Sequence, residues 1–125
     1  MKVFYKGDKY NSKVNFVDEN NVFIGYDEYD DCCSDGGWFI SDKKDDWLQE
    51  SFKEQAMEIP GFIFDTKYFN EISHNEHTDS GGVVQFRLFK DSEEKFLTLY
   101  NCHNGYYGKG FDFKICDEII KEGTL

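Results

Sequence analysis

Residues that mark nucleic-acid-binding and membrane proteins are scarce in this sequence. Arg87 is the one arginine among 125 residues, and no basic stripe alternates with the aromatic residues. Because contacts to phosphate dominate nucleic-acid affinity, we expect no direct binding to nucleic acid. No run approaches the roughly 20 apolar residues of a membrane-spanning helix, and the first residues lack the apolar stretch of a signal peptide. We therefore expect a cytoplasmic protein that does not bind membranes.

Cysteine is also sparse, and the four in the chain are Cys32, Cys33, Cys102 and Cys116. A cytoplasmic setting favours reduced thiols. The adjacent Cys32 and Cys33 are poor partners for one another, because neighbouring residues strain the disulfide geometry. Pairing of either one with Cys102 or Cys116 across the fold stays open.

Negative charge is in excess, and it is concentrated in one third of the chain. The net charge is −11, and residues 18–58 hold 13 Asp and Glu against 3 Lys. Such a field repels nucleic acid and anionic membranes, and it favours cationic partners, metal ions or solubility. The acidic stretch therefore predicts a surface for a basic partner.

Aromatic residues make up 18% of the chain, which provides enough apolar area for a core. We expect one globular domain over residues 1–125 with an α+β fold, in which a mostly antiparallel sheet of about six or seven strands is joined by one amphipathic helix near residues 45–58. The predicted strands cover residues 13–17, 22–26, 38–40, 62–64 with its continuation at 67–72, 83–90, 96–100 and 111–115. We expect a hairpin turn at residues 18–21 and a terminal helical turn at residues 119–121.

The helix prediction depends on apolar spacing and on capping. One helical face would carry Trp47, Leu48, Phe52, Ala56 and Ile59. Asp45 or Ser41 can cap the first turn, and Pro60 ends the helix. The exposed face would then present Asp45, Asp46, Glu50 and Glu54.

Residues 27–37 form the densest polar cluster and hold most candidates for a metal site. A calcium loop would place Asp31 and Asp35 at ligand positions, but Cys33 stands where an oxygen ligand is needed. A zinc site would need Cys32, Cys33, Cys102 and His103 to converge without the usual spacing. Buried thiols beside a solvated acidic loop are the simpler interpretation, so we expect no cofactor. The metal candidates are Asp31, Cys32, Cys33, Asp35, Cys102 and His103.

Nucleophilic catalysis has one candidate, Cys102. If the two residues lie on a strand, its neighbour His103 points to the opposite face, which is wrong for a thiolate–imidazole pair. His74 or His77 could serve instead, but nothing in the sequence requires it. We expect a non-enzymatic protein.

Residues 105–110 read Gly-Tyr-Tyr-Gly-Lys-Gly. The Lys spacing and the strand-like residues that follow exclude a Walker-type phosphate loop, and the glycines suit a turn. Exposed tyrosines beside glycines are common recognition elements. Tyr106 and Tyr107 are therefore candidates for a binding edge.

Two short motifs carry a resemblance to other proteins. Asp31-Cys32-Cys33 within residues 27–37, followed by Asn104-Gly105-Tyr106-Tyr107 and then Phe111-Asp112-Phe113, resembles an uncharacterised family of small phage and bacterial proteins. The resemblance covers residues 13–115. It implies a bacterial or phage cytosolic setting and a compact β-rich fold, and it implies no activity.

These observations predict an acidic, non-enzymatic binding protein, in the role of an inhibitor, immunity or anti-defence protein whose acidic face imitates nucleic acid towards a basic partner. The predicted contacts are Asp27, Glu28, Tyr29, Asp30, Asp31, Asp45, Asp46, Glu50, Glu54, Tyr106 and Tyr107, with Trp47 as a further aromatic anchor. The alternative is a small-molecule or metal-ion binding module that uses the Asp-Cys-Cys loop and the Tyr/Gly turn. The oligomeric state is left open.

Overall fold

Alternating apolar residues and short turns build ten antiparallel strands in the part of the chain that the structure describes. A computed structural model describes residues 1–7, 12–28, 34–42, 55–72, 80–103 and 108–125, with the backbone alone for residues 34, 35, 72, 80, 81 and 103. The strands are β1 (Lys2–Lys6), β2 (Lys13–Val17), β3 (Val22–Asp27), β4 (Ser34–Ser41), β5 (Ile63–Phe64), β6 (Asn70–Ile72), β7 (Ser80–Lys90), β8 (Glu93–His103), β9 (Gly110–Ile115) and β10 (Glu118–Thr124). Nowhere in these ranges is there a helix with the length and apolarity to cross a membrane.

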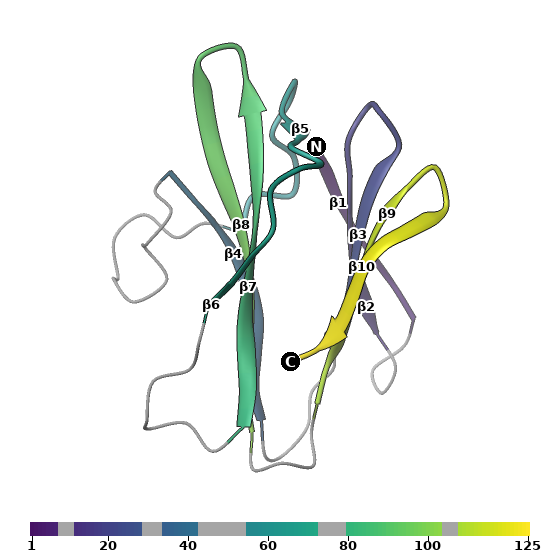
Figure 1. Cartoon of the computed structure of the whole chain (residues 1–125), viewed down its shortest axis with the longest axis vertical. Coiled ribbons are helices and arrows are strands. Elements are labelled where there is room, and N and C mark those ends of the chain that lie inside the picture. The colour runs from purple at the N-terminus through teal and green to yellow at the C-terminus, as the bar shows by residue number, and fades with distance from the viewer. Residues whose placement is uncertain (8–11, 29–33, 43–54, 73–79, 104–107) are drawn as a thin grey trace.

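The strands form two sheets that face one another (Figure 1). The first, here called sheet A, has the order β1-β2-β3-β9-β10, and the second, sheet B, has the order β4-β8-β7-β5, with β6 also paired to β7. The chain leaves sheet A after β3 and returns to it at β9. Strands from both ends of the sequence therefore become neighbours in sheet A.

Asp18 fixes the turn of the β2–β3 hairpin. Its Oδ1 atom accepts hydrogen bonds from the backbone N–H groups of Asn20 (2.9 Å) and Val22 (3.0 Å), and Asn21 takes a positive φ of 58°. Its Oδ2 atom accepts the N–H of Phe64 (2.8 Å), which ties the β5 segment to this turn. The predicted hairpin is confirmed, and its turn chemistry also joins the two sheets.

The core lies between the sheets, and eight of the twenty core residues in the described part of the chain are aromatic. Phe16 of β2 meets Trp38 of β4 edge to face, with ring centroids 5.0 Å apart. Phe86 of β7 meets Phe113 of β9 in the same way at 5.1 Å. Edge-to-face pairs of this kind stabilise by about 0.5–1.5 kcal/mol beyond their buried area.

The middle of sheet B is buried on both faces. Val84, Phe86 and Leu88 face the core as their alternation predicts, but Gln85 and Thr98 on the other face are also fully buried. Gln85 Nε2 donates to Thr98 Oγ1 (3.2 Å), which satisfies these polar groups in part. Burial on both sides explains why residues 96–99 show little polar alternation.

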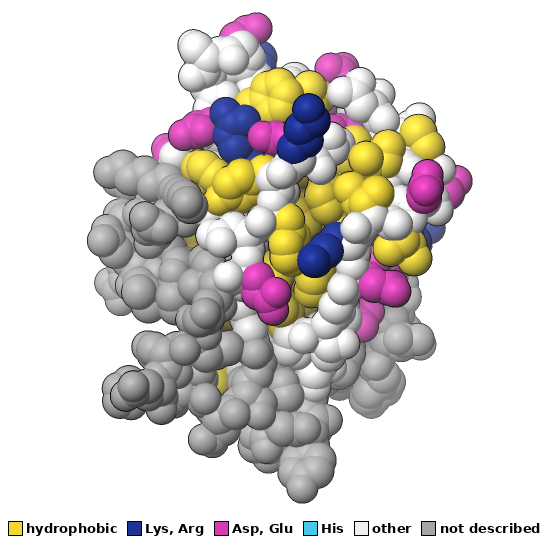
Figure 2. Space-filling view, viewed as in Figure 1, with side chains coloured by type: hydrophobic (Ala, Val, Ile, Leu, Met, Phe, Trp, Pro, Cys, Tyr) yellow, Lys and Arg dark blue, Asp and Glu magenta, His cyan; other side chains and the backbone are white. Residues whose placement is uncertain are grey.

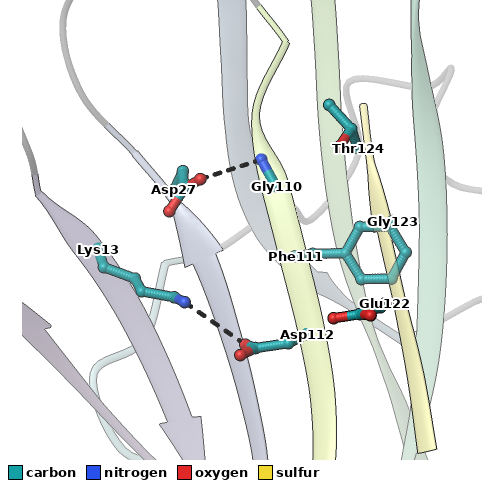
Figure 3. Close-up of a pocket in the computed structure, with 8 residues that line it drawn as sticks. All are labelled: Lys13, Asp27, Gly110, Phe111, Asp112, Glu122, Gly123 and Thr124. Carbon is teal, nitrogen blue, oxygen red and sulfur yellow. Dashed lines mark hydrogen bonds and ion pairs between the residues drawn. The ribbon is translucent and has the colours of Figure 1, made fainter. Parts of the chain in front are cut away.

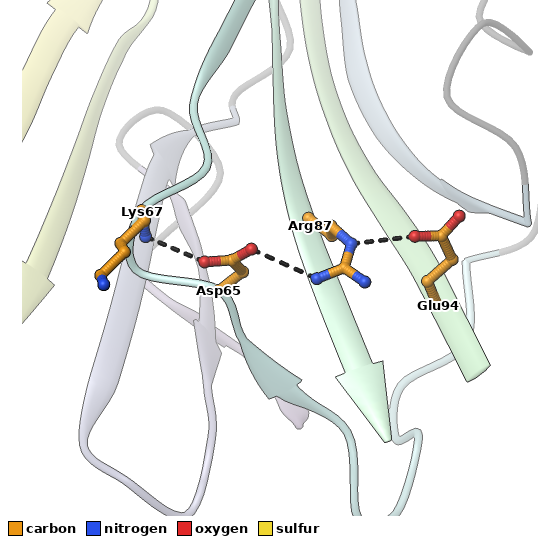
Figure 4. Close-up of polar contacts among 4 residues, drawn as sticks. All are labelled: Asp65, Lys67, Arg87 and Glu94. Atoms are coloured by element: carbon orange, nitrogen blue, oxygen red, sulfur yellow. Dashed lines mark hydrogen bonds and ion pairs between the residues drawn. The ribbon is translucent and has the colours of Figure 1, made fainter. Parts of the chain in front are cut away.

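An ion-pair chain fixes the segment after β5 to sheet B (Figure 4). Arg87 Nη1 lies 3.2 Å from Asp65 Oδ2, and Arg87 Nε lies 2.9 Å from Glu94 Oε2. The hydrogen bond to Glu94 raises the pKa of Arg87, so the guanidinium stays charged. Asp65 Oδ1 also accepts the Lys67 N–H (3.0 Å).

One edge of the sandwich, beside β10, leaves apolar side chains at the surface. Figure 2 shows hydrophobic side chains between the two sheets, with charged side chains among them. Ile119 and Ile120 of β10 are 50% and 41% exposed. The Lys121 Nζ atom stands 4.9 Å from the centre of the Phe69 ring. A lysine and a bulge at Ile119/Lys121 are common means by which an edge strand avoids pairing with other chains.

The predicted α+β class is wrong, because the described residues are all-β and contain no helix. Residues 43–54, most of the predicted helix 45–58, lie outside the described residues. The rest, residues 55–58, is not helical: Met57 O accepts the Val3 N–H (2.8 Å), and Glu58 forms a bridge with Lys2. Backbone groups that a helix would pair internally are thus paired with β1. The predicted helical turn at 119–121 is likewise wrong, since these residues belong to β10.

Candidate functional site

Most side chains predicted to contact a partner lie outside the described residues. These are Tyr29, Asp30, Asp31, Asp45, Asp46, Glu50, Glu54, Tyr106 and Tyr107, together with Trp47, the histidines His74 and His77, and the metal candidates Cys32 and Cys33. Asp27 and Glu28 are described in full, and Asp35 and His103 by their backbone. For the residues outside the described ranges, the predicted contact and metal-binding roles stay predictions.

The backbone brings the attachment points of the two predicted binding segments together. β4 begins at Ser34, directly after Asp31-Cys32-Cys33, and β8 ends at His103, directly before Asn104. Ser34 is the register partner of His103, and Asp35 is the partner of Cys102. The strand ends lie at the lower end of sheet B in Figure 1.

The described residues alone do not make a metal site or a catalytic pair. Within them, no group of three or more His, Cys, Asp or Glu side chains is placed to hold a metal ion. Cys102 is exposed, with a free thiol. The proposed zinc and calcium sets include residues outside the described ranges, so they stay predictions.

Asp27 connects the end of β3 to the start of β9. Its Oδ2 atom accepts the backbone N–H of Gly110 (3.1 Å), across 83 positions in the sequence. The hydrogen bond joins the residue before the acidic loop to the residue that ends the Tyr/Gly turn. Asp27 therefore has a structural role in addition to the predicted contact role.

Glu28 lies beside Tyr5 of β1. Its backbone N–H donates to Ser12 O (3.0 Å), and its carbonyl accepts the Ser12 hydroxyl. Burial raises the pKa of Tyr5, and the Glu28 carboxylate raises it further, whereas the hydrogen bond from Trp38 opposes the shift. Glu28 is half-buried, so only part of it is open to a partner.

A hollow on the outer face of sheet A gathers carboxylates from three adjacent strands. It has a volume of about 440 Å³ and is lined by Lys13, Asp27, Gly110, Phe111, Asp112, Glu122, Gly123 and Thr124. Figure 3 shows Asp27 on β3, Asp112 on β9 and Glu122 on β10 around this space. We call it the carboxylate hollow.

Glycine in the middle of β3 allows the charged side chains to meet. A Cβ atom at Gly25 would lie 2.5 Å from Asp112 Oδ1 and 2.6 Å from Lys13 Cε. Lys13 can therefore cross β3 at a glycine and approach Asp112, with 3.6 Å between Nζ and Oδ1. An interior glycine in a strand commonly marks such a close approach.

The carboxylate hollow holds more negative than positive groups. Among the described residues, three carboxylates line it, whereas Lys13 is the one lining cation. Lys114 pairs with the other oxygen of Asp112 at 3.1 Å. Glu122 is the direct register partner of Asp112, and it extends towards Asp112 in Figure 3. Like charges opposite one another destabilise a sheet, and a bound cation relieves the repulsion.

Sequence reasoning did not select Asp112, Glu122 or Lys13 as site residues. Asp112 occurs in the Phe-Asp-Phe alternation of residues 111–113, which places it on the outer face of its strand. Gly25 interrupts a run of β-forming residues, and such a glycine could have indicated a close approach of other side chains to this strand. Glu122 could not be placed, because residues 119–121 were expected to be helical.

Comparison with protein-family models, with curated proteins and with solved structures found no match. The resemblance to small phage and bacterial proteins stays a prediction.

Proposed function

We propose that the protein is a non-enzymatic binding protein that engages a basic protein partner, and that the carboxylate hollow receives a cationic side chain of that partner. The observation that carries this proposal is the convergence of Asp27, Asp112 and Glu122 on one hollow, where Lys13 is the one cation among the described lining residues. The net charge of −11 supports it through long-range attraction.

An arginine fits the chemistry of the hollow. Carboxylates accept the paired N–H groups of a guanidinium in a planar, often bidentate arrangement. Asp112 lies near the centre of the hollow but is shared with two lysines, whereas Glu122 is exposed and directly opposite it. Glu122 is therefore the carboxylate best placed to bind an incoming cation, with Asp112 as the second acceptor.

The biological setting is part of the same proposal. The resemblance implies a phage or bacterial cytoplasm, where an acidic protein of this kind would act as an inhibitor, immunity or anti-defence protein on a basic partner. The acids of residues 30–31 and 45–54 lie outside the described residues, and their contact with the partner stays a prediction. Association should be fast and sensitive to salt.

A charge-reversal experiment tests the hollow. A fluorescent, blocked Gly-Arg-Gly-Arg-Gly peptide is titrated into wild type, Glu122→Lys and Glu118→Lys, with anisotropy as the readout. We expect Glu122→Lys to weaken binding about tenfold more than Glu118→Lys. Both variants change the net charge equally, but only Glu122→Lys removes a close pair between a carboxylate of the hollow and an arginine of the peptide. Both residues are exposed on β10, and Glu118 does not line the hollow.

Equal weakening by the two variants would show that only net charge matters, and the hollow would then not be the site. Circular dichroism of each variant checks that the sheet is intact.

A small-molecule or metal-ion site is the second candidate function, and the register pairing of Ser34 with His103 favours it. This pairing attaches the Asp-Cys-Cys loop and the Tyr/Gly turn to neighbouring strand ends. Native mass spectrometry of the full chain with added Zn²⁺ or Ca²⁺ tests it. A bound ion that is lost in Cys32→Ser or Asp31→Asn supports the candidate, and a bare chain mass contradicts it.

A further inference from the structure

The outer face of sheet A also carries two phenylalanines outside the carboxylate hollow. Phe4 of β1 and Phe23 of β3 lie on the same side of the sheet as Asn15 and Gly25, away from the core. Their rings meet edge to face with centroids 6.2 Å apart. Both are half-buried, so each ring keeps some surface open to solvent.

Lysines stand over both rings. Lys6 Nζ lies 5.8 Å from the centre of the Phe4 ring, and Lys114 Nζ lies 5.9 Å from the centre of the Phe23 ring. Cation–π contacts at such exposed sites contribute only about 0.5–1 kcal/mol. The contacts hold the ammonium groups near the rings. Lys114 also pairs with Asp112 at 3.1 Å, whereas no ion pair to a described residue occupies the donors of Lys6. We call Phe4, Lys6, Phe23 and Lys114 the lysine–phenylalanine patch.

Lys6 lacks the charge compensation that neighbouring lysines have. It is directly opposite Lys13 in the β1–β2 register, and like charges in this position repel. Lys13 is paired with Asp112, and Lys114 is paired with the same residue. Among the residues that the structure describes, Lys6 has no ion pair. Within the described part of the chain, Lys6 is thus a cation without an acidic partner beside a half-buried aromatic ring, in a protein whose net charge is −11.

A second hollow lies at this patch. Its volume is about 500 Å³, and its lining residues are Lys6, Val17, Asn21, Phe23, Lys114, Cys116 and Asp117. Its described lining holds two cations and one carboxylate, whereas the described lining of the carboxylate hollow has more carboxylates than cations. Val17 and Phe23 supply an apolar floor beside the lysines.

We propose that the lysine–phenylalanine patch binds a short acidic peptide segment, with a carboxylate on Lys6 and an apolar side chain over Phe23. Two observations favour a short peptide over a polyanion. The cations are few and do not form a track, and the net charge of the protein repels the dense charge of nucleic acid or an anionic membrane. At physiological ionic strength screening acts over about 8 Å, so the local lysines can still attract a single carboxylate.

The test uses two blocked, fluorescent peptides, Glu-Phe-Glu-Phe-Glu and Lys-Phe-Lys-Phe-Lys, with anisotropy as the readout. We expect the acidic peptide to bind wild type even though the protein is strongly negative. Lys6→Glu should weaken that binding about tenfold, because an attraction becomes a repulsion at close range. The matched control is Lys67→Glu, an exposed lysine outside both hollows with the same change in net charge, and it should change binding by less than about twofold.

Three outcomes would overturn the proposal. One is no binding of the acidic peptide to folded wild type, and another is equal weakening by Lys6→Glu and Lys67→Glu. The third is tighter binding of a short oligo(dT), lost in Lys6→Glu, which would make the patch a nucleic-acid site. Circular dichroism checks folding, and Lys6→Gln provides a milder variant if Lys6→Glu fails to fold. Glu122→Lys should leave acidic-peptide binding unreduced, so this test is independent of the basic-partner proposal.

Discussion

Burial decides which carboxylates of the acidic stretch serve stability and which face solvent. Asp18 is 6% exposed and accepts three backbone hydrogen bonds, whereas its neighbour Glu19 is exposed. The acidic surface predicted for residues 18–58 includes Asp18, but the buried Asp18 side chain is not available to a partner. Two adjacent acids with the same charge thus have different roles.

Asp18→Asn should destabilise the protein by about 2 kcal/mol, because hydrogen bonds to a charged acceptor contribute about 1.5–3 kcal/mol and an amide offers only one acceptor oxygen. Urea unfolding measured at neutral pH gives the free energy of unfolding. The matched control is Glu19→Gln, which removes the same charge and should change stability by no more than about 0.5 kcal/mol. Similar losses in both variants would mean that Asp18 acts through its charge alone.

The shape of the carboxylate hollow depends on Gly25 of strand β3. A methyl group at this position would meet Asp112 and Lys13 at the far ends of flexible side chains, which can move aside. The backbone itself need not shift, since the position is an ordinary extended one in the β2–β3 and β3–β9 ladders.

Gly25→Ala should therefore separate the Lys13–Asp112 pair and reduce arginine-peptide binding several-fold, while stability changes by no more than about 1 kcal/mol. Peptide anisotropy and urea unfolding measure the two effects. Glu122→Gln is the companion variant, because it removes a carboxylate and adds no volume. Unchanged peptide binding in Gly25→Ala would show that the ligand does not use the floor of the hollow.

The predicted strands were right where alternation and turn residues agreed. Residues 13–17 and 22–26 became β2 and β3, and residues 83–90 became part of β7. The strands predicted at 38–40, 83–90 and 96–100 were too short, because β4, β7 and β8 extend beyond them into glycine and polar residues. Glycine and polar residues lower β propensity, but ladder pairing with a neighbouring strand overrides that preference.

β1 and β10 were not predicted as strands, and both are edge strands of sheet A. An edge strand needs little apolar patterning, because one of its sides has no partner strand in the sheet. β10 shows this most clearly, since every residue in it is exposed. The alternation of apolar and polar residues therefore does little to predict edge strands of this kind.

Charge acts on the whole molecule in two opposing ways. The net charge of −11 favours expansion through self-repulsion. Specific pairs oppose it, including Arg87 with Asp65 and Glu94 in the chain of ion pairs in Figure 4. Such partly exposed pairs contribute little individually, so the repulsion should dominate the response to salt.

We expect the free energy of unfolding at neutral pH to rise by about 1 kcal/mol as NaCl increases from about 10 mM to 150 mM, because screening shortens from about 30 Å to 8 Å. Urea titrations at each salt concentration measure it. Arg87→Met should show a larger rise, since it removes salt-sensitive attraction and one positive charge. A fall in stability with salt would mean that ion pairs outweigh the net repulsion.

The sequence by itself determined the β-rich character, the β2–β3 hairpin and the excess of acid, because these follow from local alternation, turn residues and composition. Only the tertiary structure decided that Met57 and Glu58 pair with β1, that Asp18 is buried and that Asp27, Asp112 and Glu122 share one hollow. The physical reason is the order of sheet A, which places β3 beside β9 and β10 and joins Asp27 to Gly110 across 83 positions. Such pairings depend on how two sheets bury their apolar faces together, and no local pattern encodes them.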